Sequence, residues 1–473
     1  MVFSSSIFLL YFLPLFLLVY HLVPSKLKNY VILLASIFFY SWGAPKFLFV
    51  ILGSTIIDFY IVKQLFLSQV KSKRKLLLGL SIFINLGLLV YFKYVNFFIE
   101  NLNYSLASVG VDNMEWVKII LPIGISFYTF QTLTYSIDVY RKKHEPLIKL
   151  TDYLVYIMSF PQMIAGPIVR FSSIADQIIN RKEVIDDKLI GFYRFSIGLA
   201  KKVLIANVMA EQADLIFDSD YSLLSMPNAW LGMLAYTFQI YFDFSGYSDM
   251  AIGLGKMMGF TFPENFNSPY VSRSISEFWR RWHITLGDFM KDYLYIPLGG
   301  NRVSSKYRLY FNLWIVFILS GLWHGASWNY VIWGAYHGVF LILDRLFLQQ
   351  FLNKIGKFPS ILITFIFVMI GWVIFKVEEL AELKIYLSKL VQPFDKIEFD
   401  SNPAFNLVVC FAILFAFITS LKFGKKLGTF MFERNSYNLK NHIALTVISM
   451  MLFIVSLSSI TSSGFNPFIY FRF

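Results

Sequence analysis

Two histidines are the first candidates for chemistry, one inside a long uncharged run and the other in the basic stretch that precedes it. His324 lies in GLWHGASWNY, inside a 35-residue run (Leu309–Leu343) that contains no Asp, Glu, Lys or Arg. His283 follows two arginines and a tryptophan in FWRRWH. A neutral imidazole can accept a proton near pH 7, so it can activate a hydroxyl for attack on an acyl carbonyl. His324 is therefore a candidate catalytic base, and His283 is its candidate partner.

Each histidine also has a structural interpretation, in which its ring packs in the fold and bonds a backbone carbonyl. On the residues alone, function and packing are evenly balanced for His324, whereas an interfacial role beside Trp282 fits His283 somewhat better. His337 lies 13 residues beyond His324, more than three helical turns away, and we interpret it as structural. The others lie near the ends of apolar runs and are interpreted as interfacial: His21, His144 and His442.

Basic side chains surround His283. Arg280 and Arg281 could hold the phosphates of a cytosolic donor, because a guanidinium matches the geometry of a phosphate. For most cations of this stretch, attraction to anionic lipid headgroups is the simpler explanation, at about 1 kcal/mol per residue. These cations include Arg273, Lys291, Arg302, Lys306 and Arg308.

The elements that carry these side chains follow from length and charge. At about 1.5 Å of rise per residue, one helix over Leu309–Leu343 would reach roughly 50 Å. A bilayer's hydrocarbon core is about 30 Å thick. The run therefore predicts two spans, joined or bent near Gly321–Asn329, with His324 within the membrane's depth. Upstream, Asp243, Ser245 and Asp249 either cap a helix or line a cavity, and capping is favoured.

Composition identifies the class of protein. Hydrophobic residues make up 57% of the 473 residues and charged residues only 15%, so the apolar surface cannot all be hidden inside a water-soluble globule. Uncharged runs of this length predict membrane-spanning helices, because lipid satisfies no backbone polar group. The net charge of +13 resides in short loops between apolar runs, which indicates membrane topology rather than nucleic-acid binding. A single cysteine, Cys410, lies in an apolar run and is interpreted as packing; no metal site is expected.

The order of charged loops predicts an all-α polytopic membrane protein with about 11–12 transmembrane helices. The basic cluster KSKRK at 71–75 marks a cytoplasmic loop, which places the N-terminus outside. Residues 153–170 are apolar but are interrupted by Pro161, Gly166 and Pro167, so we expect a re-entrant piece. Residues 263–308 carry seven Lys/Arg against four Asp/Glu, which is typical of helices lying at a membrane face.

Six segments occur in a recognisable order: FPQMIAGPIVRF, YFDFSGYSDMAIGLGKMMGF, PENFNSPY, SISEFWRRWHITL, DYLYIPLGGNR and LWHGASWNYVIWGAYHG. Together they resemble the membrane-bound O-acyltransferase family, and most closely its bacterial branch of alginate O-acetyltransferase membrane subunits. The D-alanyl transfer protein of teichoic acids is a more distant relative. The resemblance implies a ring of helices around a central funnel, and it places the family's two functional histidines at His324 and His283.

The sequence thus predicts one integral-membrane acyltransferase domain over residues 1–473, with its catalytic core at about 119–345. The resemblance implies transfer of an acetyl group, from acetyl-CoA as donor, towards an extracytoplasmic polysaccharide such as alginate. It also implies a periplasmic or surface-anchored acetyltransferase partner and the bacterial inner membrane as location. No tightly bound cofactor is expected. The alternatives are D-alanyl or other acyl transfer to a cell-wall polymer, and a non-catalytic transporter or scaffold for a separate acetylase.

Overall fold

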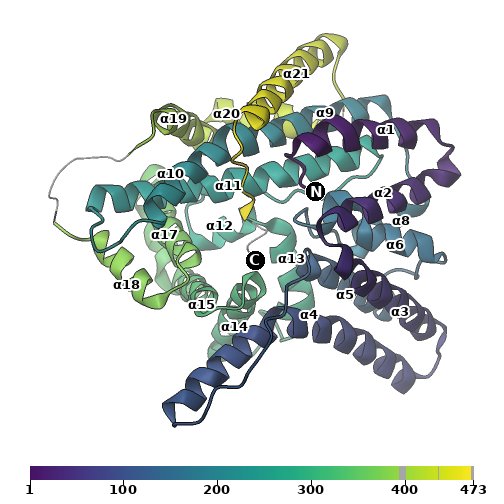
Figure 1. The fold of residues 1–473 in the computed structure, drawn as a ribbon, viewed down its shortest axis with the longest axis horizontal. Coiled ribbons are helices and arrows are strands. Elements are labelled where there is room, and N and C mark those ends of the chain that lie inside the picture. Colours follow the sequence, from purple (N-terminus) through teal and green to yellow (C-terminus); the bar gives the residue numbers. More distant parts are fainter. Residues whose placement is uncertain (394–400, 435, 470–473) are drawn as a thin grey trace. The chain divides into compact units, whose positions relative to one another are not determined.

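A computed structural model describes residues 1–393, 401–434 and 436–469. Helices joined by turns and loops make up these residues, which include no β-strand (Figure 1). The chain divides into two compact units. Unit 1 comprises residues 1–184 and 258–263, and unit 2 comprises residues 185–257 and 264–473.

Unit 1 is built from apolar helices of very different lengths. They are η1 (Phe8–Phe12), α1 (Leu13–Leu22), η2 (Ser25–Leu27), α2 (Lys28–Gly43), η3 (Pro45–Phe47), α3 (Leu48–Leu67), α4 (Lys71–Ser108), α5 (Ile125–Tyr140), α6 (Leu150–Met158), α7 (Phe160–Met163) and α8 (Phe171–Ile179). The predicted interruption of residues 153–170 is confirmed, because α6 stops at Met158 and α7 lasts only four residues. Nearly all side chains of this interrupted piece are buried in protein, which is how irregular backbone is tolerated in an apolar setting.

A buried carboxylate connects four helices of unit 1. Asp58 of α3 is fully buried and accepts hydrogen bonds from the Ser81 hydroxyl at 2.5 Å and from Tyr153 at 2.8 Å. The Asn85 amide at 3.2 Å and the Ser136 hydroxyl at 3.3 Å complete its shell. Because a buried polar group is costly unless it is hydrogen-bonded, this shell specifies how α3, α4, α5 and α6 pack.

Unit 2 contains the candidate catalytic residues. Its helices are α9 (Ile185–Ala200), η4 (Lys201–Ala206), α10 (Asn207–Phe217), α11 (Met226–Met257), η5 (Pro269–Val271), α12 (Ile275–Arg281), α13 (Ile284–Met290), η6 (Lys291–Tyr295), α14 (Lys306–His324), α15 (Trp328–Leu343), η7 (Asp344–Leu348), α16 (Gln349–Lys354), α17 (Lys357–Lys376), α18 (Leu380–Lys389), α19 (Pro403–Phe417), η8 (Ile418–Ser420), α20 (Lys422–Gly428), η9 (Thr429–Glu433) and α21 (Leu439–Ser462).

Helices α9 and α11 run side by side through unit 2 and touch backbone to backbone (Figure 1). A Cβ atom added to Gly198 would lie 2.5 Å from the carbonyl oxygen of Gly246. About two helical turns further along α11, a Cβ atom added to Gly253 would lie 2.5 Å from the carbonyl oxygen of Gly191. Small residues at such positions are the usual way for membrane helices to approach closely, since packing rather than water exclusion drives their association.

Six of the described helices are long and apolar enough to cross a membrane. They cover Pro45–Leu67, Lys71–Ser108, Trp328–Lys354, Lys357–Lys376, Pro403–Ser420 and Leu439–Ser462. Other expected spans coincide with shorter or more polar helices, among them α2, α5 and α11. The chain is thus an all-α, multi-pass membrane protein.

The glycine contact between α9 and α11 leads to a first prediction. Gly198→Ala should lower the free energy of unfolding by about 1–3 kcal/mol, the usual cost of overpacking, because the backbone of α11 cannot move aside. Thermal unfolding of the purified protein in detergent measures this change. Gly87→Ala in α4 is the matched control, since nothing lies within 4 Å of a Cβ there. Equal stability of the two variants would contradict the proposed close contact.

Candidate active site

The uncharged run forms two helices that meet within the predicted bend at Gly321–Asn329, although only the second, continued to Lys354, is among the helices long and apolar enough to cross a membrane. Helix α14 ends at His324, and α15 begins four residues later at Trp328. The extended Gly325 between them has φ −161°, and the chain turns back so that α15 packs along α14. Side chains at Gly321 or Gly325 would overlap Tyr330 of α15. The glycines before and after His324 therefore allow the tight reversal that holds this histidine at the end of its helix.

Aromatic rings enclose His324. Its side chain is only 5% exposed, and its ring centroid lies 4.9 Å from that of Trp323 and 5.1 Å from that of Trp333. Phe375 of α17 contacts it at 5.3 Å. Such apolar walls lower the local dielectric constant and strengthen every electrostatic interaction that a substrate makes there.

His283 occupies the corner between α12, which ends at Arg281, and α13, which begins at Ile284. Its backbone is left-handed, with φ 45° and ψ 53°. Only a few per cent of non-glycine residues adopt this conformation, histidine more often than most, and such residues cluster at functional sites. The unusual backbone is an observation that favours a functional role for His283 over the interfacial one.

Asn265 holds both the backbone and the ring of this corner. Its carbonyl oxygen accepts the Ile284 N–H at 2.9 Å. Its side-chain oxygen lies 3.0 Å from His283 Nδ1 and accepts the Thr285 hydroxyl at 2.9 Å, while its amide nitrogen donates to the Ser248 hydroxyl at 3.0 Å. Because the oxygen is an acceptor, His283 donates from Nδ1 and keeps its lone pair on Nε2.

The other ring nitrogen of His283, Nε2, is available to a ligand. Nε2 is buried and has no hydrogen-bond partner among the residues that the structure describes. Burial lowers the pKa of His283 to about 3, so the ring is neutral at physiological pH. A neutral, oriented imidazole with a buried lone pair can accept a hydrogen bond or a proton from a reacting group.

The fold brings the two predicted histidines together around one side chain. Trp323 contacts the His283 ring at 6.0 Å between centroids and the His324 ring at 4.9 Å. On its other side, His283 meets Phe244 of α11 edge-on at 4.8 Å. The two histidines that the sequence suggested as partners therefore both contact the Trp323 indole, within an enclosure of aromatic rings.

The arginines ahead of His283 line a separate, polar cavity of about 390 Å³. Its walls are Arg273, Ser274, Glu277, Arg280, Arg281, Gln349 and Asn353, and neither histidine is among them. Helix α12 separates the two environments: it turns its arginines to the cavity and packs Trp279 against Trp333 and His337 at ring distances of 5.4 and 5.0 Å. One short helix thus connects an anion-attracting cavity with the aromatic enclosure.

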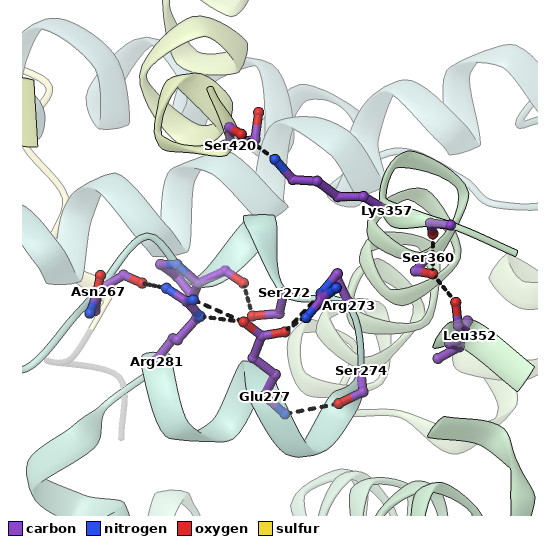
Figure 2. A network of polar contacts seen from close by, with 12 residues as sticks. Asn267, Ser272, Arg273, Ser274, Glu277, Arg281, Leu352, Lys357, Ser360 and Ser420 are labelled. Carbon is purple, nitrogen blue, oxygen red and sulfur yellow. Dashed lines mark hydrogen bonds and ion pairs between the residues drawn. The ribbon is translucent and has the colours of Figure 1, made fainter. Parts of the chain in front are cut away.

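Glu277 lies between two of these arginines, as Figure 2 shows. It accepts the Arg273 backbone N–H at 3.0 Å and pairs with Arg281 at 2.8 Å. Burial alone would raise the pKa of Glu277, but these hydrogen bonds and the two positive charges lower it below its ordinary value. Glu277 is therefore ionised at neutral pH and neutralises part of the cavity's positive charge.

Helix α12 is itself fixed at its start by two polar contacts. The hydroxyl of Ser274 accepts the Glu277 N–H at 3.1 Å and so caps the start of the helix (Figure 2). Asp344, at the end of α15, accepts the Ser276 N–H at 2.7 Å. The helix that carries the arginines and leads to His283 is thus attached to the hairpin that carries His324.

Two expectations need correction. Capping was favoured for Asp243, Ser245 and Asp249, but all three lie in the interior of α11. The two carboxylates are ion-paired instead, Asp243 with Lys202 at 2.9 Å and Asp249 with Arg194 at 2.7 Å. The spacing of these residues within the sequence could not show this, because Lys202 lies in η4 and Arg194 in α9, 41 and 55 residues before their partners.

The separation of His337 from His324 also needs correction. Since the chain reverses after His324, the two histidines lie on different helices and both contact Trp333, at 5.0 and 5.1 Å. The number of helical turns between them in sequence therefore does not measure their separation.

The other cations predicted to meet lipid fall into two groups. Arg273 lines the cavity, whereas the remaining four are exposed and do not line it: Lys291, Arg302, Lys306 and Arg308.

Asn265 is the residue that sequence reasoning missed. It lies in the segment PENFNSPY, which was noted only for its family pattern. Its contact with His283 spans 18 residues and depends on a loop that runs against the α12–α13 corner. No helical or strand periodicity encodes such a loop contact.

The comparisons with known proteins show the class to which this helical membrane protein belongs. The chain belongs to the membrane-bound O-acyltransferase family, whose model matches residues 34–381. It is therefore an O-acyltransferase.

Three relatives illustrate the similarity. The probable alginate O-acetylase AlgI of Pseudomonas aeruginosa is 46% identical over 386 residues, which cover 80% of this chain and 73% of that protein. The probable alginate O-acetylase AlgI of Pseudomonas putida is 40% identical over 500 residues, and the alignment covers 100% of both chains. The peptidoglycan O-acetyltransferase of Helicobacter pylori is 38% identical, with 80% of this chain and 78% of that protein covered.

The left-handed backbone of His283 leads to a second prediction. Asparagine tolerates this conformation, so His283→Asn should keep a thermal unfolding midpoint close to that of the wild type. Acyl transfer should fall about 10²–10⁴-fold, the usual contribution of a positioned acid or base. His283→Gln, which lacks this tolerance, should lose both stability and activity. An Asn variant with full activity would assign His283 a structural role.

Proposed function

We propose that this protein transfers an acetyl group from acetyl-CoA towards the hydroxyls of an extracytoplasmic polysaccharide, alginate or a similar exopolysaccharide. The observation that carries the proposal is the pair of buried imidazoles, His283 and His324, in contact with one indole. The acceptor class is supported by relatives named as alginate O-acetylases, one of them aligned along the whole chain.

In the proposed reaction, an acceptor hydroxyl attacks the thioester carbonyl. His324 takes the hydroxyl proton as the new C–O ester bond forms. The C–S bond then breaks, and the proton passes to the leaving sulfur, so that CoA departs as a thiol and the step is balanced. His283 assists from the donor side through its Nε2 atom, which has no partner among the described residues. Transient acylation of His324 is the variant of this scheme in which the imidazole itself carries the acetyl group.

The donor's phosphates would lie in the arginine-lined cavity. Arg280 and Arg281 are predicted phosphate ligands, and Arg273 adds a third guanidinium to the same walls. The side chains of Gln349 and Asn353 add neutral hydrogen-bonding groups. Only two residues separate Arg280 from His283 along the chain, so a donor anchored at the cavity would lie near the aromatic enclosure.

The proposed location is the bacterial inner membrane, with the N-terminus outside and the basic loop before α4 in the cytoplasm. A cytosolic donor and an extracytoplasmic acceptor then require the acetyl group to cross the membrane at the site. A periplasmic or surface-anchored acetyltransferase is the proposed partner that receives the group and delivers it to the polymer.

A donor assay on the purified protein tests the function. Incubation with radiolabelled acetyl-CoA should transfer label or release CoA, and His324→Ala should reduce this turnover by about 10²–10⁴-fold. His144→Ala is the matched control, because that histidine lies in unit 1, beside Phe171.

The alternatives give different results in the same assay. A scaffold for a separate acetylase would acetylate equally well with His324→Ala once the acetylase is added. A D-alanyl transferase would ignore acetyl-CoA and accept label only from an activated D-alanyl donor. Turnover of acetyl-CoA that survives His324→Ala would refute the assignment of the catalytic centre.

The position of Glu277 leads to a further prediction. An ionised carboxylate between Arg273 and Arg281 competes with the donor's phosphates for the same guanidinium groups. Glu277→Gln should therefore lower the KM for acetyl-CoA by severalfold, roughly the effect of one charge-assisted contact, and should leave kcat nearly unchanged. Steady-state kinetics at low ionic strength measures the effect. Glu382→Gln, an exposed position in α18, should change neither constant. A raised KM would show that Glu277 organises the arginines rather than opposing the donor.

A further inference from the structure

Arg194 of α9 lies in the middle of a polar network within unit 2. Its guanidinium binds Glu264 through two nitrogens, at 2.8 and 2.5 Å, and its Nε donates to Asp249 at 2.7 Å. The second oxygen of Asp249 pairs with Lys201 at 2.6 Å. Arg194 and Asp249 are both buried. A single planar guanidinium thus joins the long helix α11 to the loop that follows it.

The two carboxylates that Arg194 joins are the chain neighbours of the residues that hold His283. Asp249 follows Ser248, and Glu264 precedes Asn265. Ser248 accepts a hydrogen bond from Asn265, and Asn265 accepts one from His283 Nδ1. Two parallel contacts therefore span the same gap between α11 and the loop: a charged one through Arg194 and a neutral one through Asn265.

We propose that Arg194 and Glu264 are positioning residues for His283, and that they act by fixing Asn265. This inference rests on the proposed function, in which His283 assists acyl transfer. Asn265 can hold the Nδ1–H tautomer of His283 only if its side-chain amide keeps one orientation, with the oxygen towards the imidazole and the nitrogen towards Ser248. The bidentate Arg194–Glu264 contact restrains the backbone from which that amide projects.

The strain at the α12–α13 corner makes such restraint necessary. His283 is held in a left-handed conformation, and the Asn265 carbonyl accepts the N–H of the next residue, Ile284, at 2.9 Å. The Asn267 N–H in turn donates to the Arg281 carbonyl at 2.9 Å. Without the restraint on the loop that carries Asn265, the backbone of His283 could change to a right-handed or extended conformation. That change would move the Nε2 atom of His283 away from the site. Partners one step removed from a metal-ligating histidine typically change activity 10–100-fold when they are removed, and we expect an effect of similar size here.

Two variants and a matched control test the inference on the full-length protein. Glu264→Gln removes the charge from a side chain that is half exposed, so the fold should persist. Arg194→Lys keeps the charge but cannot form the planar, bidentate contact. Lys256→Gln removes another ion pair between the same two helices, with Asp187 at 3.1 Å, and is the control.

The measurements are the kcat and KM of acetyl transfer together with ¹⁵N spectra of histidine-labelled protein. The His283 signals are identified by their absence in His283→Asn. We expect Glu264→Gln and Arg194→Lys to lower kcat by about tenfold or more, with little change in the KM for acetyl-CoA. The His283 spectrum should change from the Nδ1–H form to a mixture of tautomers. Lys256→Gln should leave both readouts as in the wild type.

The readouts separate this inference from the proposed function. A normal His283 spectrum in Glu264→Gln and Arg194→Lys would overturn the positioning role, whatever happens to activity or stability. A changed His283 spectrum in these variants supports the positioning role even if the wild type does not turn over acetyl-CoA. Absence of turnover in the wild type would instead refute acetyl-CoA as the donor. A kcat loss in Lys256→Gln as large as in Glu264→Gln would also overturn the inference, because it would show a general effect of loosening α9 from α11.

Discussion

The backbone contact between α9 and α11 is the constraint on which unit 2 depends. Glycines at both ends of the contact allow the carbonyls of one helix to meet the other at a distance that no side chain permits. Between these glycines, α9 presents Arg194 and α11 presents Asp249, so the charged groups meet where the helices cannot separate. A buried ion pair contributes little net stability but is costly to disrupt. Its value here is that it fixes the register of two helices and the loop that reaches His283.

Electrostatics divides the site into two regions with different tasks. Three arginines line a polar cavity, where Glu277 pairs with two of them and offsets part of their positive charge. The histidines lie among aromatic rings, where burial keeps His283 neutral. Helix α12 belongs to both regions, since its polar face lines the cavity and Trp279 packs among the rings. In the proposed function, the charged part of the donor would be held in the polar cavity while its thioester reacts among the aromatic rings.

The hairpin of α14 and α15 completes the site by geometry rather than by charge. Because α14 stops at His324, the imidazole lies at a helix end, where the chain reverses and the neighbouring glycines leave room. Asp344 at the far end of α15 accepts a backbone N–H at the start of α12. This hydrogen bond ties the element that carries one histidine to the element that leads into the other.

The sequence by itself determined the class and the chain reversal near His324, because apolar runs, charge distribution and local motifs are properties of neighbouring residues. It also singled out His283 and His324 as candidate catalytic residues. Only the tertiary structure decided which groups meet. It placed both imidazoles on Trp323, gave His283 its left-handed backbone and its partner Asn265, and paired Asp249 with Arg194 instead of capping a helix. The His283–Asn265 contact joins residues 18 positions apart, and the Arg194–Asp249 contact joins residues 55 positions apart. The contacts with Trp323 depend on how the helices pack. Local spacing cannot encode them, because the approach of two helices is set by shape complementarity along their whole length.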